Sequence, residues 1–375
     1  MDALMLPLNW QKVRLGDIGK PCMCKRVMKH QTTRYGEIPF YKIGTFGNTA
    51  DAFISKKLFL EYKTKYSFPK KGDILISASG TIGRAVIYDG KPAYFQDSNI
   101  VWIDNDETLV KNDFLFYAYS NIKWNTEHTT ILRLYNDNFR NTLIPLPPLN
   151  EQIAIANVLS DLDHYLYSLD ALILKKESVK KALSFELLSQ RKRLKGFNQA
   201  WQRVRLGDIC EITTGSLDAN EMVHYGKYRF YTCAKEYYFI DKYAFDTEAI
   251  LISGNGAYVG YVHYYKGKFN AYQRTYVLDN FSEHIIFVKY FLTMFLQSHI
   301  QTNRNEGNTP YIVMATLKDF EIFLPPLNEQ IAIANVLSGL DSEIISLKNK
   351  KRQFENIKKA LNHDLMSAKI RVLKQ

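Results

Sequence analysis

A string of eighteen residues occurs twice in the chain, and no other feature constrains the fold as strongly. The copies occupy residues 146–163 and 324–341 and are identical at seventeen of the eighteen positions. A second string lies upstream of each copy. It reads Trp-Gln-Lys-Val-Arg-Leu-Gly-Asp-Ile from Trp10 and Trp-Gln-Arg-Val-Arg-Leu-Gly-Asp-Ile from Trp201. The chain therefore reads as one module written twice.

Composition limits the class of protein and the kind of partner. The 375 residues are 46% apolar, which is enough for two or more domains with buried cores. The net charge of +11 favours an acidic partner, with nucleic acid the leading candidate, although a merely basic soluble protein would look the same. Four cysteines suit a reducing cytosol better than a disulfide framework. No apolar run approaches about 20 residues and no secretion signal is evident, so we expect a cytoplasmic protein.

The two parts between the repeated strings, residues 1–145 and 196–325, share a framework of short elements. An apolar run in each part, at 73–77 and 250–253, predicts a buried strand, and a glycine turn follows it. The exposed positions beyond the turn differ between the two parts. A shared framework with different exposed residues is what two domains that recognise different sequences would need. Drift after an old duplication would also produce it.

Smaller expectations follow from aligning the two parts. A strand is predicted at 96–103, with Gln273 falling at the position of Gln96. The pair Asp89-Gly90 predicts a hairpin turn. Its counterpart in the second part is the Lys-Gly-Lys stretch at 266–268.

A long helix is predicted after each Pro-Pro pair. Proline is tolerated at a helix start, and neither proline nor glycine occurs between Glu151 and Arg193. Forty helical residues would span about 60 Å. Apolar residues in both copies step by three and four, which is typical of a coiled coil, so we expect the two helices to pair antiparallel. A helix packed on its own domain is the alternative, but a mean globular helix has only about 11–12 residues. The predicted pairing residues are Leu159, Leu162, Leu166, Leu169, Ile173, Leu183 and Leu187 in the first copy, and Leu337, Leu340, Ile344, Leu347, Phe354, Leu361 and Leu365 in the second.

No catalytic constellation is evident. The chain lacks a Gly-x-x-x-x-Gly-Lys phosphate loop and a His-Glu-x-x-His metal motif, and its eight histidines form no ligand-spaced cluster. The stretch 308–311, Asn-Thr-Pro-Tyr, resembles the Asn-Pro-Pro-Tyr signature of adenine methyltransferases, but one position differs and no glycine-rich cofactor motif precedes it. We therefore expect a non-catalytic chain with no metal site and no cofactor of its own.

The remaining chemistry is that of binding. Lysine and arginine suit phosphate, whereas arginine, asparagine and glutamine can read base edges in the major groove. For each single residue, a solvated surface role is the alternative. The candidates for DNA contact are Arg34, Lys70, Lys71, Arg84, Gln96 and Arg133 in the first part, and Lys227, Arg229, Lys235, Lys268, Gln273 and Arg274 in the second.

These features together resemble a known family. Two variable parts, each opening with Trp-Gln-x-Val-Arg-Leu-Gly-Asp-Ile and closing with Pro-Pro-Leu-Asn-Glu-Gln before a long helix, are similar to the specificity subunit of type I restriction–modification enzymes. The resemblance covers nearly the whole chain. It implies an α+β fold with target-recognition domains at 1–147 and 196–325, separated by conserved-type helices at 148–195 and 326–375.

The resemblance also implies a function. Each domain would read one half of a split double-stranded DNA target, while the paired helices fix the spacer and dock two methylation subunits. Those subunits would carry the S-adenosylmethionine chemistry, and ATP and Mg would belong to partner subunits, including a restriction or translocase subunit. The best candidates for DNA-facing loops are the glycine turns and the residues before each terminal strand, namely Thr129, Thr130, Asn308, Thr309 and Tyr311. A self-contained methyltransferase or nuclease, and an adaptor without DNA readout, remain as alternatives.

Overall fold

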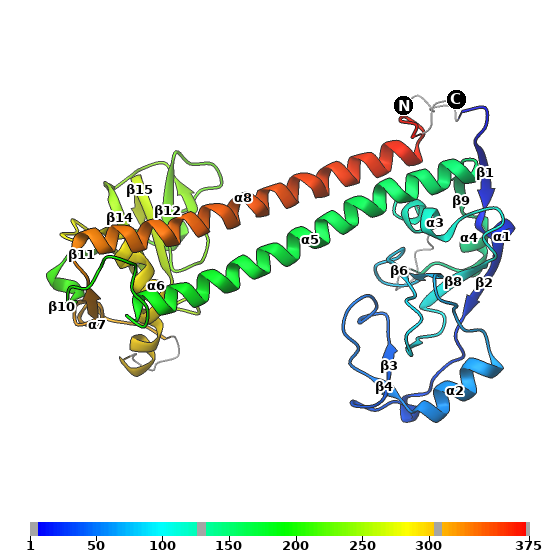
Figure 1. Cartoon of the computed structure of the whole chain (residues 1–375), viewed down its shortest axis with the longest axis horizontal. Coiled ribbons are helices and arrows are strands. Elements are labelled where there is room, and N and C mark those ends of the chain that lie inside the picture. The colour runs from blue at the N-terminus through cyan, green and yellow to red at the C-terminus, as the bar shows by residue number, and fades with distance from the viewer. Residues whose placement is uncertain (1–6, 126–132, 304–309, 373–375) are drawn as a thin grey trace. The chain divides into compact units, whose positions relative to one another are not determined.

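The chain forms two compact units. The computed structural model describes residues 7–125, 133–303 and 310–372. The first unit comprises residues 1–170 and 350–375, and the second comprises 171–349. Each unit holds a globular part of mixed strands and helices together with half of each of two long helices, α5 (Leu149–Leu188) and α8 (Leu327–Met366) (Figure 1).

Short strands in three small sheets build the first globular part. The sheet orders are β2-β8-β5-β6, β4-β3-β7 and β1-β9. The elements in chain order are β1 (Gln11–Arg14), α1 (Leu15–Ile18), β2 (Gly19–Met23), β3 (Ile38–Tyr41), β4 (Phe53–Ile54), α2 (Lys56–Lys65), β5 (Ile74–Ser77), β6 (Ala85–Ile87), β7 (Tyr94–Phe95), β8 (Ile100–Asn105), α3 (Asn112–Tyr119), α4 (Asn136–Asn141) and β9 (Leu143–Leu146).

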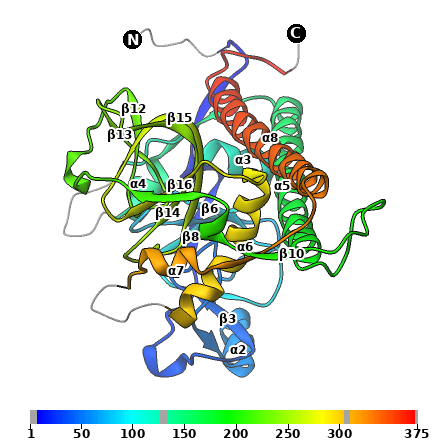
Figure 2. The ribbon, with the colours of Figure 1, turned by 90° about the vertical axis from the view of Figure 1, so that its left-hand side faces the viewer.

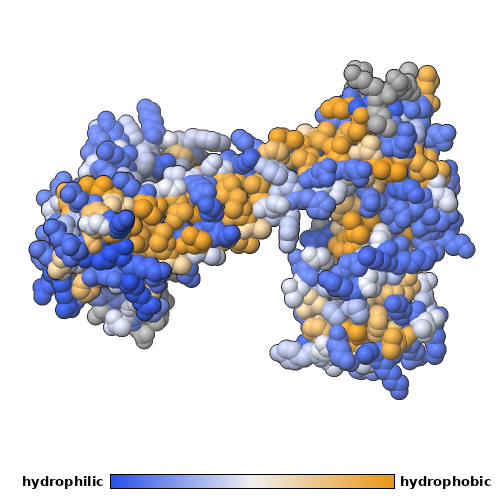
Figure 3. Space-filling model, viewed as in Figure 1, coloured by the Kyte–Doolittle hydropathy of each residue, from blue (hydrophilic) through white to orange (hydrophobic). Residues whose placement is uncertain are grey.

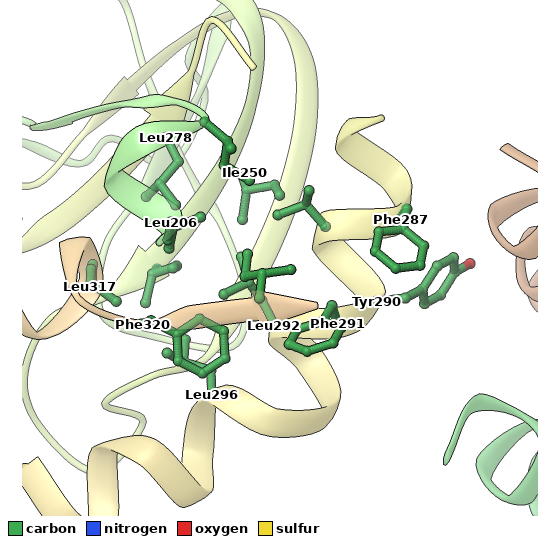
Figure 4. Packing of buried hydrophobic residues seen from close by; sticks show 14 of the residues in the cluster. Leu206, Ile250, Leu278, Phe287, Tyr290, Phe291, Leu292, Leu296, Leu317 and Phe320 are labelled. Carbon is green, nitrogen blue, oxygen red and sulfur yellow. The ribbon is translucent and has the colours of Figure 1, made fainter. Parts of the chain in front are cut away.

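One larger sheet dominates the second globular part. It has six strands in the order β11-β16-β14-β15-β12-β13, and β10 pairs with β17 beside it. Phe287 and Phe291 of α6 pack with Ile250 and Leu278 of the sheet in one buried cluster (Figure 4). The elements in chain order are β10 (Gln202–Arg205), β11 (Glu211–Thr214), β12 (Tyr228–Tyr231), β13 (Tyr238–Ile240), β14 (Phe245–Ser253), β15 (Val262–Ala271), β16 (Thr275–Asp279), α6 (Ile285–Asn303), α7 (Met314–Lys318) and β17 (Glu321–Leu324).

The two repeated strings of each module meet in space. Strand β1 comes from the Trp10 string and pairs antiparallel with β9, which leads into the first Pro-Pro, with Val13 opposite Ile144. Strands β10 and β17 pair in the same way, with Val204 opposite Ile322. The repeated strings therefore close each globular part at the point where its long helix begins.

Three local predictions are wrong. The strand expected at 96–103 begins only at Ile100. The stretch 266–268 lies inside β15 and is no turn, since β15 runs unbroken from Val262 to Ala271. The Asp89-Gly90 turn joins no hairpin, because β6 pairs only with β5 whereas β7 pairs with β3. The Asp89 carboxylate accepts a hydrogen bond from the amide of Lys91, and Pro92 lacks an N–H. The first part therefore cannot form one continuous strand here, as the second part does in β15.

The two long helices run side by side in opposite directions within each unit (Figures 1 and 2). This agrees with the predicted antiparallel pairing. Helix α5 ends at Leu188, before the end of the predicted segment 148–195, because Gln190 adopts a left-handed conformation with φ of 62°. Ala368, at the equivalent repeat position after α8, has φ of 56°.

The predicted pairing residues all lie on the inner faces of the helices. Seven are buried and seven are half-buried, and none is exposed. Leu159 belongs to the main apolar cluster of the first unit, and Leu337 belongs to that of the second. Leu169, Ile173 and Ile344 are buried without belonging to either cluster. The helix ends thus pack on a globular part, as the alternative expected, while their middle stretches pack on each other.

A polar junction ties each globular part to both helices. In the second unit, Asp341 of α8 accepts hydrogen bonds from the Lys180 ammonium of α5 and, at 2.6 Å, from the Tyr290 hydroxyl of α6. In the first unit, Asp163 accepts from Lys358 and from Tyr117, in the latter case at 2.8 Å. Both aspartates close the eighteen-residue repeat, so the repeat encodes this three-way junction.

The Asn-Glu-Gln of each repeat also has defined partners. Glu329 has no exposed side-chain surface and forms a bidentate pair with Arg193, at 3.0 and 2.5 Å. Glu151 pairs with Arg371 in the same way. The following glutamine, 1% exposed in both copies, donates to a proline carbonyl and accepts from an amide of the globular part, Lys111 in the first unit. A buried charge is tolerated only when paired, so these residues fix where each helix starts.

Within the described residues, no helix is both long enough and apolar enough to cross a membrane.

Candidate nucleic-acid interface

Three loops converge at one edge of the first globular part. The amide of Ala78 donates to the Asn99 carbonyl at 2.8 Å, and the amide of Leu134 donates to the Ala78 carbonyl at 2.8 Å. Ser79 and Arg133 form an isolated β-bridge. The glycine turn after β5, the loop before β8 and the segment before α4 are therefore held together.

The same three loops converge in the second globular part. The amide of Gly254 donates to the Arg274 carbonyl at 2.8 Å, and the amide of Ile312 donates to the Gly254 carbonyl at 3.0 Å. Asn255 and Tyr311 form the matching β-bridge. We call each set the three-loop edge, defined as 78–83, 96–99 and 133–134 in the first unit, and as 254–260, 272–274 and 310–312 in the second.

Glycine is required in the turn of this edge. Gly83 has φ of +84°, and a Cβ there would lie 2.1 Å from Nε1 of Trp124. A side chain at this position would therefore both strain the backbone and displace the indole. The backbone of this turn therefore lies directly against the Trp124 indole.

The two edges carry different side chains at equivalent positions. In the first, the Oδ1 of Asn99 accepts from the Ser79 hydroxyl at 2.7 Å and lies 3.5 Å from Nη2 of Arg133. In the second, Arg274 occupies the position of Asn99, and Gln273 precedes it, both exposed. Sequence analysis named the glycine turn that begins at Ser79 as a DNA-facing loop but missed Asn99, although the position of Asn99 within the predicted strand 96–103 was a usable signal.

The alignment of Gln273 with Gln96 is wrong. The amide of Gln96 donates to the Tyr41 carbonyl, whereas the equivalent bond in the second part runs from Tyr272 to Tyr231. The first loop has one residue more, and Ser98 in it has φ of 53°. The Oε1 of Gln96 accepts from the Ile43 amide at 2.9 Å, so this side chain holds a loop together.

Other candidates in the first part are scattered. Lys70 pairs with Asp104 at 2.9 Å, and Nη1 of Arg84 donates to the Phe46 carbonyl at 2.9 Å. Arg34 and Lys71 are exposed on other loops. The structure thus brings Arg133 to the three-loop edge but does not bring these four residues there.

Aromatic rings contact most of the basic candidate residues of the second part. The Arg229 guanidinium lies between Tyr237 and Tyr265, 4.2 and 4.4 Å from their centroids, and donates to the Tyr231 hydroxyl. Burial would lower the pKa of Arg229, but this hydrogen bond and the neighbouring tyrosines raise it, so the group is a fixed cation. Lys235 lies 5.1 Å from the centroid of the Tyr258 ring and Lys268 lies 4.6 Å from that of Tyr243, whereas Lys227 is exposed.

Four predicted residues, Thr129, Thr130, Asn308 and Thr309, lie outside the described residues. Tyr311 is described, is 39% exposed, and stands on the three-loop edge of the second unit.

The outer faces of the helices carry a repeated apolar patch. Its members occupy equivalent positions of the two copies, three in each, and are between 36% and 77% exposed. Two of them in each copy are four residues apart and so share one face of the helix. Figure 3 shows apolar surface along the helices of both units. The patch, which we call the outer patch, consists of Leu149, Ile153 and Tyr167 on α5, and Leu327, Ile331 and Ile345 on α8.

These features define a class of protein. Two globular parts repeat one framework, carry different side chains at the same edge, and join a shared scaffold through identical junctions. Such a protein has two related modules whose loop edges differ while their attachment to the helices is the same. A family model described as type I restriction modification DNA specificity domain matches residues 7–176 and again residues 198–356. The chain belongs to this family and contains its domain twice.

Individual relatives agree with the family. A Haemophilus influenzae protein named as a type I restriction enzyme specificity subunit is 63% identical over 148 residues, which is 39% of this chain and 38% of that relative. The MjaVIII specificity subunit of Methanocaldococcus jannaschii is 26% identical over 99% of this chain and 95% of its own. The S subunit structure from M. genitalium has the same fold, with a TM-score of 0.66 at 18% identity, covering 97% of this chain and 98% of that one.

Proposed function

We propose that this chain is the DNA-recognition and scaffold subunit of a type I restriction–modification complex. One observation carries the proposal. The junctions to the helices are the same in both units, whereas the three-loop edges present Ser79, Asn99 and Arg133 in one unit, and Gln273, Arg274 and Tyr311 in the other. Selection for two different sequences on one scaffold would produce this distribution.

The polar side chains of both edges suit base readout: Asn99 and Arg133 are half-buried in the first edge, and Gln273 and Arg274 are exposed in the second. Asparagine and glutamine can bond adenine through two hydrogen bonds, and arginine can bond guanine through two. The net charge of +11 supplies attraction to the phosphate backbone. We therefore assign one half of a bipartite double-stranded target to each globular part, with 1–147 and 196–325 as the recognition domains.

The paired helices serve as the spacer in this proposal. Inter-helix ion pairs such as Lys176–Glu343 and Lys351–Asp170 fix the register of α5 against α8 in each unit, each with nitrogen and oxygen 2.7 Å apart. A seven-residue slip would bring Lys176 opposite Lys350 or Val336 and would lose the pair. A single register makes a single spacer length, which a two-part target requires.

The outer patch is the proposed docking surface for two methylation subunits. Leu327 and Ile331 on α8 occupy the positions equivalent to Leu149 and Ile153 on α5, and all four are exposed. Contiguous exposed apolar side chains on a helix mark an interaction site. Because the repeat presents the same patch twice, two copies of one partner can bind.

Catalysis belongs to the partners in this proposal. S-adenosylmethionine would bind to the methylation subunits, and ATP and Mg would bind to a restriction or translocase subunit. No cluster of three or more potential metal-ligating side chains occurs among the described residues. We place the complex in the cytoplasm, which suits the four free thiols of the chain.

Domain exchange tests the proposal. Residues 20–145 are replaced by the corresponding part of another family member, the hybrid is co-expressed with the methylation subunit, and methylated adenines are mapped. One half-site should change while the other half-site and the gap persist. An unchanged methylated sequence would show that the chain is an adaptor without DNA readout. Methylation by the purified chain alone, with labelled S-adenosylmethionine, would show that it is itself an enzyme.

A further inference from the structure

Arg274 stands on a loop whose backbone is held from several sides. Its carbonyl accepts from the Gly254 amide, the neighbouring Gln273 amide donates to the Leu217 carbonyl at 2.9 Å, and the Thr275 amide donates to the Tyr272 carbonyl at 2.8 Å. A Cβ on Gly254 would lie 2.3 Å from the Arg274 carbonyl oxygen, so only glycine permits this approach. The Cα of Arg274 is therefore fixed although its side chain is exposed.

The guanidinium of Arg274 is uncommitted. Among the described residues of 196–325, Arg203 pairs with Glu321, Arg205 lies 3.6 Å from Asp319, and Arg229 is enclosed by tyrosines. Among these arginines, the Arg274 guanidinium alone forms no hydrogen bond or ion pair with another described residue, while the backbone carbonyl of Arg274 also accepts from Sγ of Cys233. An exposed arginine on a rigid loop without an internal partner is free to meet an external one.

The first unit has a different side chain at the position equivalent to Arg274. Asn99 is the equivalent of Arg274, since each carbonyl accepts the first amide after the β5 or β14 strand. The Asn99 amide oxygen is occupied by Ser79 and by Arg133, which leaves its NH₂ to donate. The same backbone position thus presents an amide in one unit and a guanidinium fork in the other.

We infer that Arg274 is a base-reading residue of the second recognition domain, and that the half-site of this domain contains a guanine contacted through the major groove. The inference rests on the proposed function. Two parallel N–H groups of the planar guanidinium match O6 and N7 of guanine, an acceptor pair that no other base presents in that groove. The loss of such a pair removes about 5- to 150-fold of discrimination.

The test uses the full chain co-expressed with its methylation subunit in a host without adenine methylation, followed by genome-wide mapping of methylated adenines. The variants are Arg274→Ala and Arg274→Lys, and the matched control is Arg205→Ala, which removes an exposed arginine from the same domain. Lysine keeps the positive charge but cannot form the bidentate pair. Both Arg274 variants should accept other bases at one guanine position of one half-site, whereas the control should keep the wild-type motif.

Two results would overturn the inference. One is an unchanged motif in both Arg274 variants. The other is a uniform loss of methylation in Arg274→Ala that Arg274→Lys restores with the motif intact, because a phosphate contact would behave in that way. The proposed function fails separately, if the wild-type chain yields no bipartite motif at all.

Discussion

Replacement of Leu337 by alanine should destabilise the second unit and leave the first unit unchanged. Leu337 has no exposed surface and belongs to the apolar cluster that joins α8 to the second globular part. Removal of a fully buried leucine side chain costs about 2–5 kcal/mol, as lost transfer energy and as a cavity. For a unit of this size, a loss of about 3 kcal/mol lowers Tm by about 6–12 °C.

The repeat provides a matched partner and a matched control. Leu159 is the equivalent residue of the first unit and is also fully buried, so Leu159→Ala should lower only the transition of the first unit. Val336 precedes Leu337, is 37% exposed, and points to another face of the helix, so Val336→Ala should change stability by less than about 1 kcal/mol. The measurement is differential scanning calorimetry of the three variants. A change below about 0.5 kcal/mol in both leucine variants, or an equal shift of both transitions by either one, would refute the assignment of each helix end to the core of its own unit.

Three further outcomes follow from the helices. Ile153→Asp should reduce the number of bound methylation subunits from two to one, and the double variant with Ile331→Asp should abolish binding. Native mass spectrometry measures the number of bound subunits. Retention of two subunits in the double variant would exclude the outer patch as the docking surface. Lys180→Asp should destabilise the second unit by about 1.5–3 kcal/mol in thermal unfolding, and adding Asp341→Lys should recover most of the loss, whereas no recovery would deny the ion pair. Burial acts to raise the pKa of Asp341, but the hydrogen bonds from Lys180 and Tyr290 outweigh this effect. The pKa therefore lies below its ordinary value of 3.8. Because the folded pKa is depressed, the stabilisation is present above pH 3.8 and is lost as the pH falls through the folded value, so Asp341→Asn should flatten the acid dependence of the second transition.

Much of the architecture could be predicted from patterns that local physics controls. The apolar spacing in both copies, together with the absence of proline and glycine after Glu151 in the first copy, correctly indicated both long helices, because helix formation depends on residues three and four apart. The end of α5 at Leu188 was missed, since the left-handed conformation of Gln190 has no strong signal in a glutamine. The Arg193–Glu329 pair was missed as well, although Arg371 stands at the equivalent repeat position and could have revealed it.

The candidate site was harder to predict because its members come together only in the folded chain. Ser79, Asn99 and Arg133 lie on three separate loops, and no spacing rule connects them. Gln96 illustrates the converse case, in which a polar residue near a predicted strand holds the backbone of Ile43 instead of facing outward. Arg229 was predicted as one of several basic residues mixed with tyrosines, and its contacts with Tyr237 and Tyr265 depend on strand pairing across the sheet.

Genome-wide mapping of methylated adenines, with the wild-type chain co-expressed beside its methylation subunit, tests the central claim most directly. The account predicts a bipartite motif, with two different half-sites separated by a gap of one fixed length. Removal of four residues from each helix at equivalent positions, 172–175 and 350–353, should change the gap and leave both half-sites intact. A continuous motif, a variable gap, or a half-site that changes with helix length would contradict it.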